Sequence, residues 1–186
     1  MSESTITVVE ISLSATAALQ QAADLRRWLL DTGVIAPNTE RDGLWQPSEY
    51  RAGPRVLWAA PEFDLWSRRS CNNGVDVITG RRVHHPIENY EPPDCPTCNT
   101  TLEEAIHTSL IEPWLAGPEP RVTCRACRAH ALLGDWIGHG NEIGQWTFQV
   151  GALAVSFNNW PALNPVFLSE LGVRMGPRWR VVAEHR

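Results

Sequence analysis

The sequence predicts an α+β fold in which an antiparallel-rich sheet packs against two helices. Segments with strand-like alternation and segments with helix-like periodicity follow one another along the chain. Of the 186 residues, 43% are hydrophobic, which is enough for one core of ordinary size. Paired cysteines interrupt this pattern in the middle of the chain. We therefore expect an α+β core domain made of residues 1–90 and 131–186, with an insertion over residues 91–130.

The first half of the expected core begins with a strand and a helix. Alternating Thr7, Val9 and Ile11 predict the strand. Ser14 is a typical helix N-cap, and Gly33 is a typical stop. Turn-forming and polar residues after Gly33 predict a long loop. The expected elements are a strand over 5–13, a helix over 15–31, a loop over 34–54, and strands over 55–59 and 75–83.

The second half of the core is expected to contain a hairpin, a short helix and a last strand. Two alternating apolar runs flank Gly151-Ala152, which has the length of a hairpin turn. That register places six apolar side chains on one face: Trp146, Phe148, Val150, Leu153, Val155 and Phe157. Asn164-Pro165 predicts a helix start and Gly172 its stop. The last strand is expected over 178–183.

The order of these elements fits a ferredoxin-like sandwich whose middle connection carries the insertion. The order is strand–helix–strand, insertion, hairpin–helix–strand, which packs two helices on one sheet. The insertion itself is expected to contain a helix. Thr100 or Thr101, each followed by a glutamate three residues later, fits a capping box at its start. Pro113 is expected to end this helix.

The cysteines carry the strongest chemical signal in the chain. Four of the five form two Cys-x-x-Cys pairs, Cys95-Pro96-Thr97-Cys98 and Cys124-Arg125-Ala126-Cys127. Each pair is short enough for both sulfurs to face one ion, and two pairs supply four thiolates. Four thiolates leave no open position for water or substrate. The spacing therefore predicts one structural Zn²⁺, with the ligands Cys95, Cys98, Cys124 and Cys127.

Thiol–disulfide exchange at the first pair is the alternative chemistry. A single Cys-x-x-Cys pair is typical of that activity when its first thiol is activated. Three carboxylates lie just upstream of the pair: Glu88, Glu91 and Asp94. Negative charge there would raise the pKa of the thiols, which argues against exchange. Cys71, which precedes the turn sequence Asn72-Asn73-Gly74, is expected to be a free thiol.

Residues 90–130 resemble the zinc-ribbon family. The resemblance rests on the two Cys-x-x-Cys knuckles, on Pro96 inside the first knuckle, and on Val122-Thr123 at the entrance to the second. It is limited to this segment and does not extend to the whole chain. It implies a bound metal ion and little about activity. The helix expected between the knuckles departs from the simplest zinc ribbons, in which hairpins dominate.

Three arginines surround the second knuckle: Arg121, Arg125 and Arg128. One interpretation is that they contact the phosphates of a nucleic acid. The other is that they donate to the thiolates or pair with the upstream carboxylates. Four thiolates around Zn²⁺ keep a net negative charge, so the second interpretation is favoured.

The overall charge excludes several classes of protein. With 21 acidic and 16 basic residues, the net charge is −5, which argues against a whole-surface polyanion binder. All basic residues are arginines, so Schiff-base and phosphate-loop lysines are excluded. No stretch approaches the roughly 20 apolar residues of a membrane span, and no basic leader precedes the first strand. We expect a cytoplasmic protein without a membrane partner.

The favoured function is a non-enzymatic intracellular zinc protein that binds another protein. The candidate partner-facing patch consists of Trp45, Tyr50 and Arg51, on the expected loop. Two alternatives stay open. One is a nucleic-acid-binding protein that uses the ribbon arginines. The other is an enzyme of unknown reaction that uses His84, His85 and Asp76 for acid–base chemistry.

Overall fold

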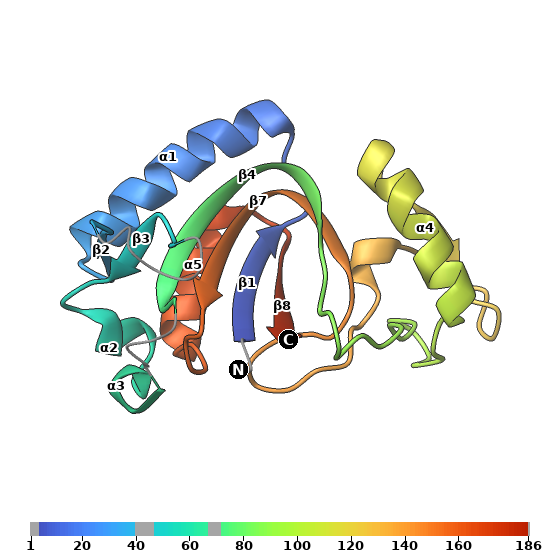
Figure 1. Cartoon of the computed structure of the whole chain (residues 1–186). Coiled ribbons are helices and arrows are strands. Elements are labelled where there is room, and N and C mark those ends of the chain that lie inside the picture. Colours follow the sequence, from blue (N-terminus) through green and yellow to red (C-terminus); the bar gives the residue numbers. More distant parts are fainter. Residues whose placement is uncertain (1–3, 40–46, 67–71, 186) are drawn as a thin grey trace.

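The fold consists of a six-stranded sheet, two helices on one of its faces, and a smaller cysteine-bearing segment (Figure 1). The computed structural model describes residues 4–39, 47–66 and 72–185. The strands are β1 (Ser4–Glu10), β2 (Ile35–Pro37), β3 (Tyr50–Ala52), β4 (Gly74–His84), β5 (Arg121–Thr123), β6 (His130–Leu132), β7 (Gln149–Asn158) and β8 (Trp179–His185). The helices are α1 (Ala15–Asp31), α2 (Val56–Ala59), α3 (Phe63–Trp66), α4 (Glu104–Ala116) and α5 (Pro165–Met175), with a 3₁₀ turn η1 (Leu133–Asp135). Among the described helices, none has the length and apolar character needed to cross a membrane.

The large sheet has the strand order β2-β3-β4-β7-β1-β8, and its paired neighbours are antiparallel. β1 lies inside it, paired with β7 from Thr5↔Asn158 to Glu10↔Leu153 and with β8 on its other side. β5 and β6 form a separate two-stranded hairpin. The prediction of a mixed fold with an antiparallel-rich sheet is therefore confirmed.

The main core lies between the sheet and the pair α1 and α5. The buried stripe of α1 has the predicted helical spacing: Ala18, Ala22, Leu25 and Leu29. Phe167 of α5 stacks on Trp28 of α1, with ring centroids 5.8 Å apart. Phe167 also meets Phe157 of β7 edge-on, at 6.0 Å. These aromatic contacts join both helices to the central strands.

Both main helices begin as the sequence predicts. Ser14 Oγ accepts from the N–H of Ala17 at 3.2 Å, and Asn164 Oδ1 accepts from the N–H of Val166 at 2.9 Å. Gly33 follows the end of α1 with a left-handed φ of 71°. α5, however, runs past Gly172 to Met175.

The two glycines that predicted a stop and a turn are instead sites of close packing. A Cβ on Gly172 would lie 2.2 Å from the Trp179 ring, so glycine is needed inside α5. A Cβ on Gly151 would lie 2.5 Å from the carbonyl oxygen of Glu10. The predicted hairpin over Trp146–Phe157 is therefore wrong, because β7 is one continuous strand through Gly151. Val150 consequently packs in a different core from Leu153, Val155 and Phe157.

Two further expectations in the first half are corrected. Within the strand expected over 55–59, Val56–Ala59 form the helix α2 instead, with the N–H of Ala60 bonded to the carbonyl of Val56 at 2.8 Å. Five residues are too few for periodicity to separate the two structures. The expected loop over 34–54 contains β2 and β3, which extend the sheet. The expected strand over 75–83 is β4, and Gly80, with φ of 94°, lies in a bulge between Thr79 and Arg82.

The helix between the cysteine pairs also differs in its ends. α4 begins after Glu103, which makes no side-chain cap bond. The predicted capping threonines serve the first knuckle instead: the carbonyl of Thr100 accepts from Cys95 N–H at 2.9 Å, and Thr101 bridges to Asp94. Pro113 lies inside α4 and does not end it.

The side chain of Glu10 joins the start of the first crossover connection, before α1, to the end of the second, before β8. Glu10 is fully buried at the end of β1. Its carboxylate accepts from Ser12 N–H, Ser12 Oγ–H and Leu13 N–H at 2.6–2.9 Å, just before α1. It also accepts from the N–H of Arg178 at 3.2 Å, just before β8. One side chain therefore fixes the entrance to α1 and the entrance to β8.

We predict that Glu10→Gln destabilises the fold by about 3 kcal/mol, because an amide NH₂ would face N–H donors that are left buried. Equilibrium urea unfolding measures this difference. The control is Glu170→Gln on the exposed face of α5, which should change stability by less than about 0.5 kcal/mol. Equal effects of the two substitutions would contradict the role of Glu10.

Candidate metal centre

The four paired cysteines converge at one point. Their sulfur atoms all lie within 4.8 Å of one another, although the two pairs are far apart in sequence. The Sγ atoms of Cys95 and Cys127 are 3.7 Å apart, and those of Cys98 and Cys124 are 3.6 Å apart. Sulfurs at about 2.3 Å from a tetrahedral ion stand about 3.8 Å from one another. The four cysteines could therefore hold a metal ion.

The two knuckles have the same backbone geometry. In the first, Cys95 N–H donates to Thr100 and the carbonyl of Cys95 accepts from Asn99 N–H, both at 2.9 Å. In the second, Cys124 N–H donates to Ala129 at 2.8 Å, and the carbonyl of Cys124 accepts from Arg128 N–H at 3.0 Å. Asn99 and Arg128, each directly after a second cysteine, are left-handed, with φ of 56° and 64°. Each Cys-x-x-Cys pair thus folds back so that both sulfurs point the same way.

Hydrogen bonds around the sulfurs favour the negatively charged thiolate form at the first knuckle, Cys95 and Cys98. The hydroxyl of Thr100, 3.2 Å from the Cys98 sulfur, lowers the pKa of that thiol to about 6. Burial raises the pKa of Cys95, but N–H bonds from Thr97 and Cys98 outweigh it and lower the value. The pKa of Cys127 is raised to about 12: an N–H bond from Ala129 lowers it, but burial and the three other sulfurs outweigh that bond. Adjacent thiolates repel one another, and a divalent cation removes that repulsion.

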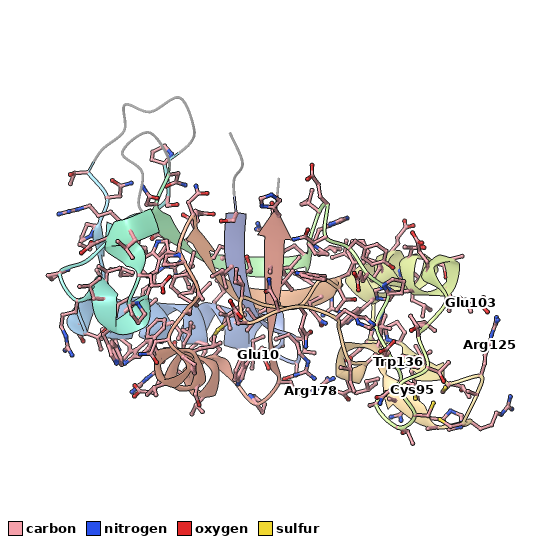
Figure 2. All side chains as sticks on the ribbon, turned by 90° about the horizontal axis from the view of Figure 1, so that it is seen from below. Glu10, Cys95, Glu103, Arg125, Trp136 and Arg178 are labelled. Carbon is pink, nitrogen blue, oxygen red and sulfur yellow. The ribbon has the colours of Figure 1, made fainter. Side chains whose placement is uncertain are left out.

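The sulfur group lies at the edge of a second hydrophobic core. Cys95 and Cys124 are buried there with Trp114 and Trp136, whereas Cys98 and Cys127 are exposed. On the sheet side, the buried strand residues of this core are Val9, Val150, Ala154 and Val182. They lie on the face opposite to α1 and α5. Figure 2 shows Cys95 and Trp136 together, away from Glu10 in the main core.

Backbone bonds close the cysteine-bearing part of the chain into a loop. The N–H of Asp94 donates to the carbonyl of Ile137 at 2.7 Å, and the N–H of Ile137 donates back at 2.8 Å. We call residues 94–137 the knuckle segment. It contains α4, β5, β6 and η1 as well as the four cysteines.

Two arginines, one in β4 and one just before β8, bind the knuckle segment to the sheet. Arg81, in the β4 bulge, donates to the carbonyls of Trp114, Leu115 and Gly117 at 2.6–3.1 Å and so caps the C-terminus of α4. Arg178, before β8, makes two bonds to Glu119 at 2.6 and 3.0 Å and one to Asp135 at 2.7 Å. Bidentate pairs of this kind are strong and directional. The predicted sites included neither arginine.

The three arginines around the second knuckle are exposed. Arg125 forms an ion pair with Glu103 at the start of α4 (Figure 2). No ion pair joins Arg121 or Arg128 to a described residue. Of the carboxylates expected to face them, Glu91 and Asp94 lie instead beside His139, at 3.8 and 3.2 Å.

The candidate catalytic residues do not meet. Asp76 and His84 lie near opposite ends of β4, roughly 25 Å apart along the strand. Asp76 accepts from Glu49 N–H at 2.7 Å and from Asn158 Nδ2 at 2.9 Å, in a structural network. His85 Nδ1 accepts from the N–H of Ile87 at 2.7 Å. His84 is buried, and burial, with a smaller effect of Arg82, lowers its pKa to about 4.

Of the predicted partner-facing patch, Tyr50 does not face outward. Tyr50 is buried in the main core, where it belongs to β3, while Arg51 is exposed. The sequence placed Tyr50 in a loop because β3 is only three residues long. Trp45 and Cys71 lie outside the described residues.

Sequence reasoning did not find the residues that attach the centre to the sheet. Trp114 follows Pro113, where the helix was expected to end, yet it is fully buried within α4. Trp136 and Glu119 have no distinctive neighbours in sequence. Their partners are remote in the chain, so no local motif marks them.

Among protein-family models, curated proteins and solved structures, none matches this chain.

The buried histidines predict a stability that falls in acid. Burial lowers the pKa of both His84 and His107 to about 4, against about 6.5 in the unfolded chain. Between these values only the unfolded state gains the proton, so stability is lost as the pH falls from about 6.5 to about 4. Each histidine accounts for up to about 3 kcal/mol of that loss.

We expect the double variant His84→Gln/His107→Gln to lose less stability over this range than the parent protein, with each single variant in between. Urea unfolding at successive pH values, compared between proteins at each pH, checks this. Acid also protonates the cysteines, but that effect is common to all four proteins. Parallel pH curves would show that the two imidazoles do not contribute.

Proposed function

We propose that the four cysteines hold one structural Zn²⁺ and that the chain is a non-enzymatic module for binding another protein. The convergence of four sulfurs carries the proposal, because a set of four thiolates is closed to water and substrate. The knuckle geometry supports a zinc-ribbon-like segment. Thiolate ligands persist where thiols stay reduced, so we place the protein in the cytoplasm.

The same proposal extends to the core as a ferredoxin-like sandwich. In chain order, β1, α1, β4, β7, α5 and β8 repeat a strand–helix–strand pattern, and their strands have the order β4-β7-β1-β8. β2 and β3 extend this unit at one edge. The knuckle segment then lies in the connection between the two halves, where it covers the face that the helices leave open.

The metal assignment is tested by elemental analysis and by substitution of single cysteines. We expect one zinc per chain, and a fall of Tm by about 10 °C or more after treatment with a strong chelator. Cys95→Ser should weaken metal binding by about two orders of magnitude, because it removes a ligand and leaves three.

Cys71→Ser is the matched control for this substitution, because it removes a cysteine outside the proposed ligand set. It should leave the zinc content at one per chain. Co²⁺ in place of zinc should give the visible absorption of a tetrahedral thiolate site. A metal-free chain in which all five thiols react freely would refute the zinc centre and favour the exchange chemistry of Cys95 and Cys98.

Nucleic-acid binding is the second candidate, and one observation favours it. Arg121 and Arg128 are exposed on the knuckle segment and form no ion pair with a described residue. Two such side chains on one hairpin, Arg121 at its open end and Arg128 in its turn, could contact phosphates. Arg125 is less suited, since Glu103 neutralises it.

For this candidate we predict that Arg121→Ala and Arg128→Ala each lower the salt dependence of binding to a short single-stranded DNA by about one counterion. Fluorescence anisotropy at several salt concentrations measures that slope. Arg27→Ala, on the far helix α1, is the control and should leave it unchanged. If the three variants behave alike, the ribbon arginines are not a nucleic-acid surface.

A further inference from the structure

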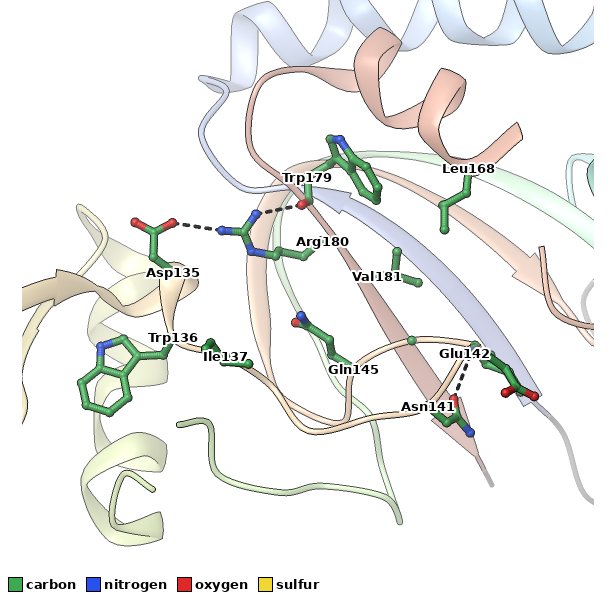
Figure 3. Close-up of a pocket in the computed structure, with 12 residues that line it drawn as sticks. Asp135, Trp136, Ile137, Asn141, Glu142, Gln145, Leu168, Trp179, Arg180 and Val181 are labelled. Atoms are coloured by element: carbon green, nitrogen blue, oxygen red, sulfur yellow. Dashed lines mark hydrogen bonds and ion pairs between the residues drawn. The ribbon is translucent and has the colours of Figure 1, made fainter. Parts of the chain in front are cut away.

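A hollow of about 510 Å³ opens where the knuckle segment meets the edge of the sheet (Figure 3). Its walls include Asp135 and Ile137 of the knuckle segment, Leu168 of α5, and Trp179 and Val181 of β8. Its volume falls in the range of known ligand sites, and junctions between two parts of a protein are common places for them.

The edge of β8 offers this hollow hydrogen-bond donors. Val181 accepts from Gln145 N–H at 2.8 Å through its outward carbonyl, and Trp179 accepts from Arg180 Nη1 at 2.8 Å. The N–H groups of Trp179 and Val181 point to the same outward side as these carbonyls. Neither N–H has a hydrogen-bond partner within residues 4–39, 47–66 and 72–185. Trp179 and Val181 both line the hollow, so its wall carries two donors without a described partner, about 7 Å apart, while the carbonyls of the same two residues are already occupied.

Two donors at this spacing match the carbonyl oxygens of residues i and i+2 in an extended peptide. Because the carbonyls of Trp179 and Val181 are already occupied, such a peptide needs no N–H groups of its own at this edge. Proline, which has no N–H, is therefore accepted there without loss of a hydrogen bond. Proline also lowers the entropy cost of binding, because its φ is fixed in advance. Proline-rich segments dock in grooves lined by aromatic side chains.

Trp179 provides an aromatic wall of that kind. Its ring lies against Gly172 of α5, where even a Cβ would come within 2.2 Å. This contact holds the ring in place. Leu168 and Val181 continue the apolar surface beside it.

The charges around the hollow indicate what should flank the apolar part of the ligand. Asp135 is already bound by Arg178 and Arg180, at 2.7 and 2.9 Å. Glu142 lines the hollow, is exposed, and forms no ion pair with a described residue. A basic residue at one end of the peptide complements this carboxylate.

We propose that the hollow binds a proline-rich, extended segment of a partner protein, with a basic residue at one end. Carbonyl groups of the segment accept from Trp179 N–H and Val181 N–H. This inference rests on the proposed function, since it names the surface and the chemistry of the partner. It also links the surface to the metal centre, because Ile137 is bonded to Asp94, the neighbour of Cys95.

The direct test is titration of the ¹⁵N-labelled, metal-loaded protein with the capped heptapeptide Pro-Leu-Pro-Pro-Val-Pro-Arg. We expect saturable shifts of the backbone amides of Trp179 and Val181. A strand-forming peptide, Thr-Val-Thr-Val-Thr-Val-Arg, should bind more weakly. Shifts that avoid these two amides, or tighter binding of the strand-forming peptide, would overturn the proposal.

Substitutions separate the two contacts. Val181→Pro removes one donor at an outward edge position and should weaken binding about fivefold, whereas Val181→Ile keeps the donor and should not. Glu142→Lys changes only an exposed side chain and should weaken binding of the Arg-ended peptide about threefold. It should not affect the same peptide ending in Leu. Unchanged binding in both Val181→Pro and Glu142→Lys would overturn the proposal.

The metal content of the same samples keeps this inference apart from the proposed function. A metal-loaded chain that ignores the peptide overturns the peptide site and leaves the zinc centre standing. A metal-free chain that binds it overturns the zinc centre and supports the peptide site. Sedimentation without peptide tests whether a second copy of the chain occupies the hollow. Self-association, together with a change in the NMR shift of the Val181 amide, would overturn the proposal.

Discussion

The buried carboxylate of Glu10 is the interaction on which the arrangement of the sheet and helices depends. It accepts hydrogen bonds from the turn before α1 and from the chain before β8, so it fixes where both of these elements begin. The backbone approaches it closely: a Cβ on Gly176 would lie 2.8 Å from Glu10 Cγ. Because Arg178 donates its N–H to Glu10 and its guanidinium to Glu119, the same point also positions the knuckle segment.

Each face of the sheet is covered by a different kind of structure. On one face, α1 and α5 bury a conventional apolar core with stacked aromatic rings. On the other face, the knuckle segment covers Val9, Val150 and Val182, using two tryptophans and two of the cysteines. A segment of this length buries too little apolar surface to fold alone. Its stability must come from contact with the sheet and from the bound ion that we propose.

The sequence predicted those features whose partners are near in the chain or repeat at fixed spacing. The first strand, which ends at Glu10 and not at the expected residue 13, is of this kind, as are the helix 15–31, its cap at Ser14 and the convergence of the cysteine pairs. Gly151 and Gly172 were misinterpreted because a glycine that permits close packing looks the same in sequence as one that makes a turn. Arg81 and Arg178 were not found because their partners lie 33 and 59 residues away, where no local pattern marks them.

The cysteine group and the sheet depend on each other through the second core. Without the knuckle segment, Val9, Val150, Ala154 and Val182 would form an exposed apolar face, which a monomeric protein rarely tolerates. Without the sheet, Trp114 and Trp136 would lose the surface that buries them. The hydrogen bonds and ion pairs of Arg81 and Arg178 orient the segment, but they do not hold its two knuckles together. An ion held by the four cysteines would do so, because it would join Cys95 and Cys98 to Cys124 and Cys127 across the loop that contains α4. Loss of such an ion would therefore act on the sheet face as well as on the cysteines.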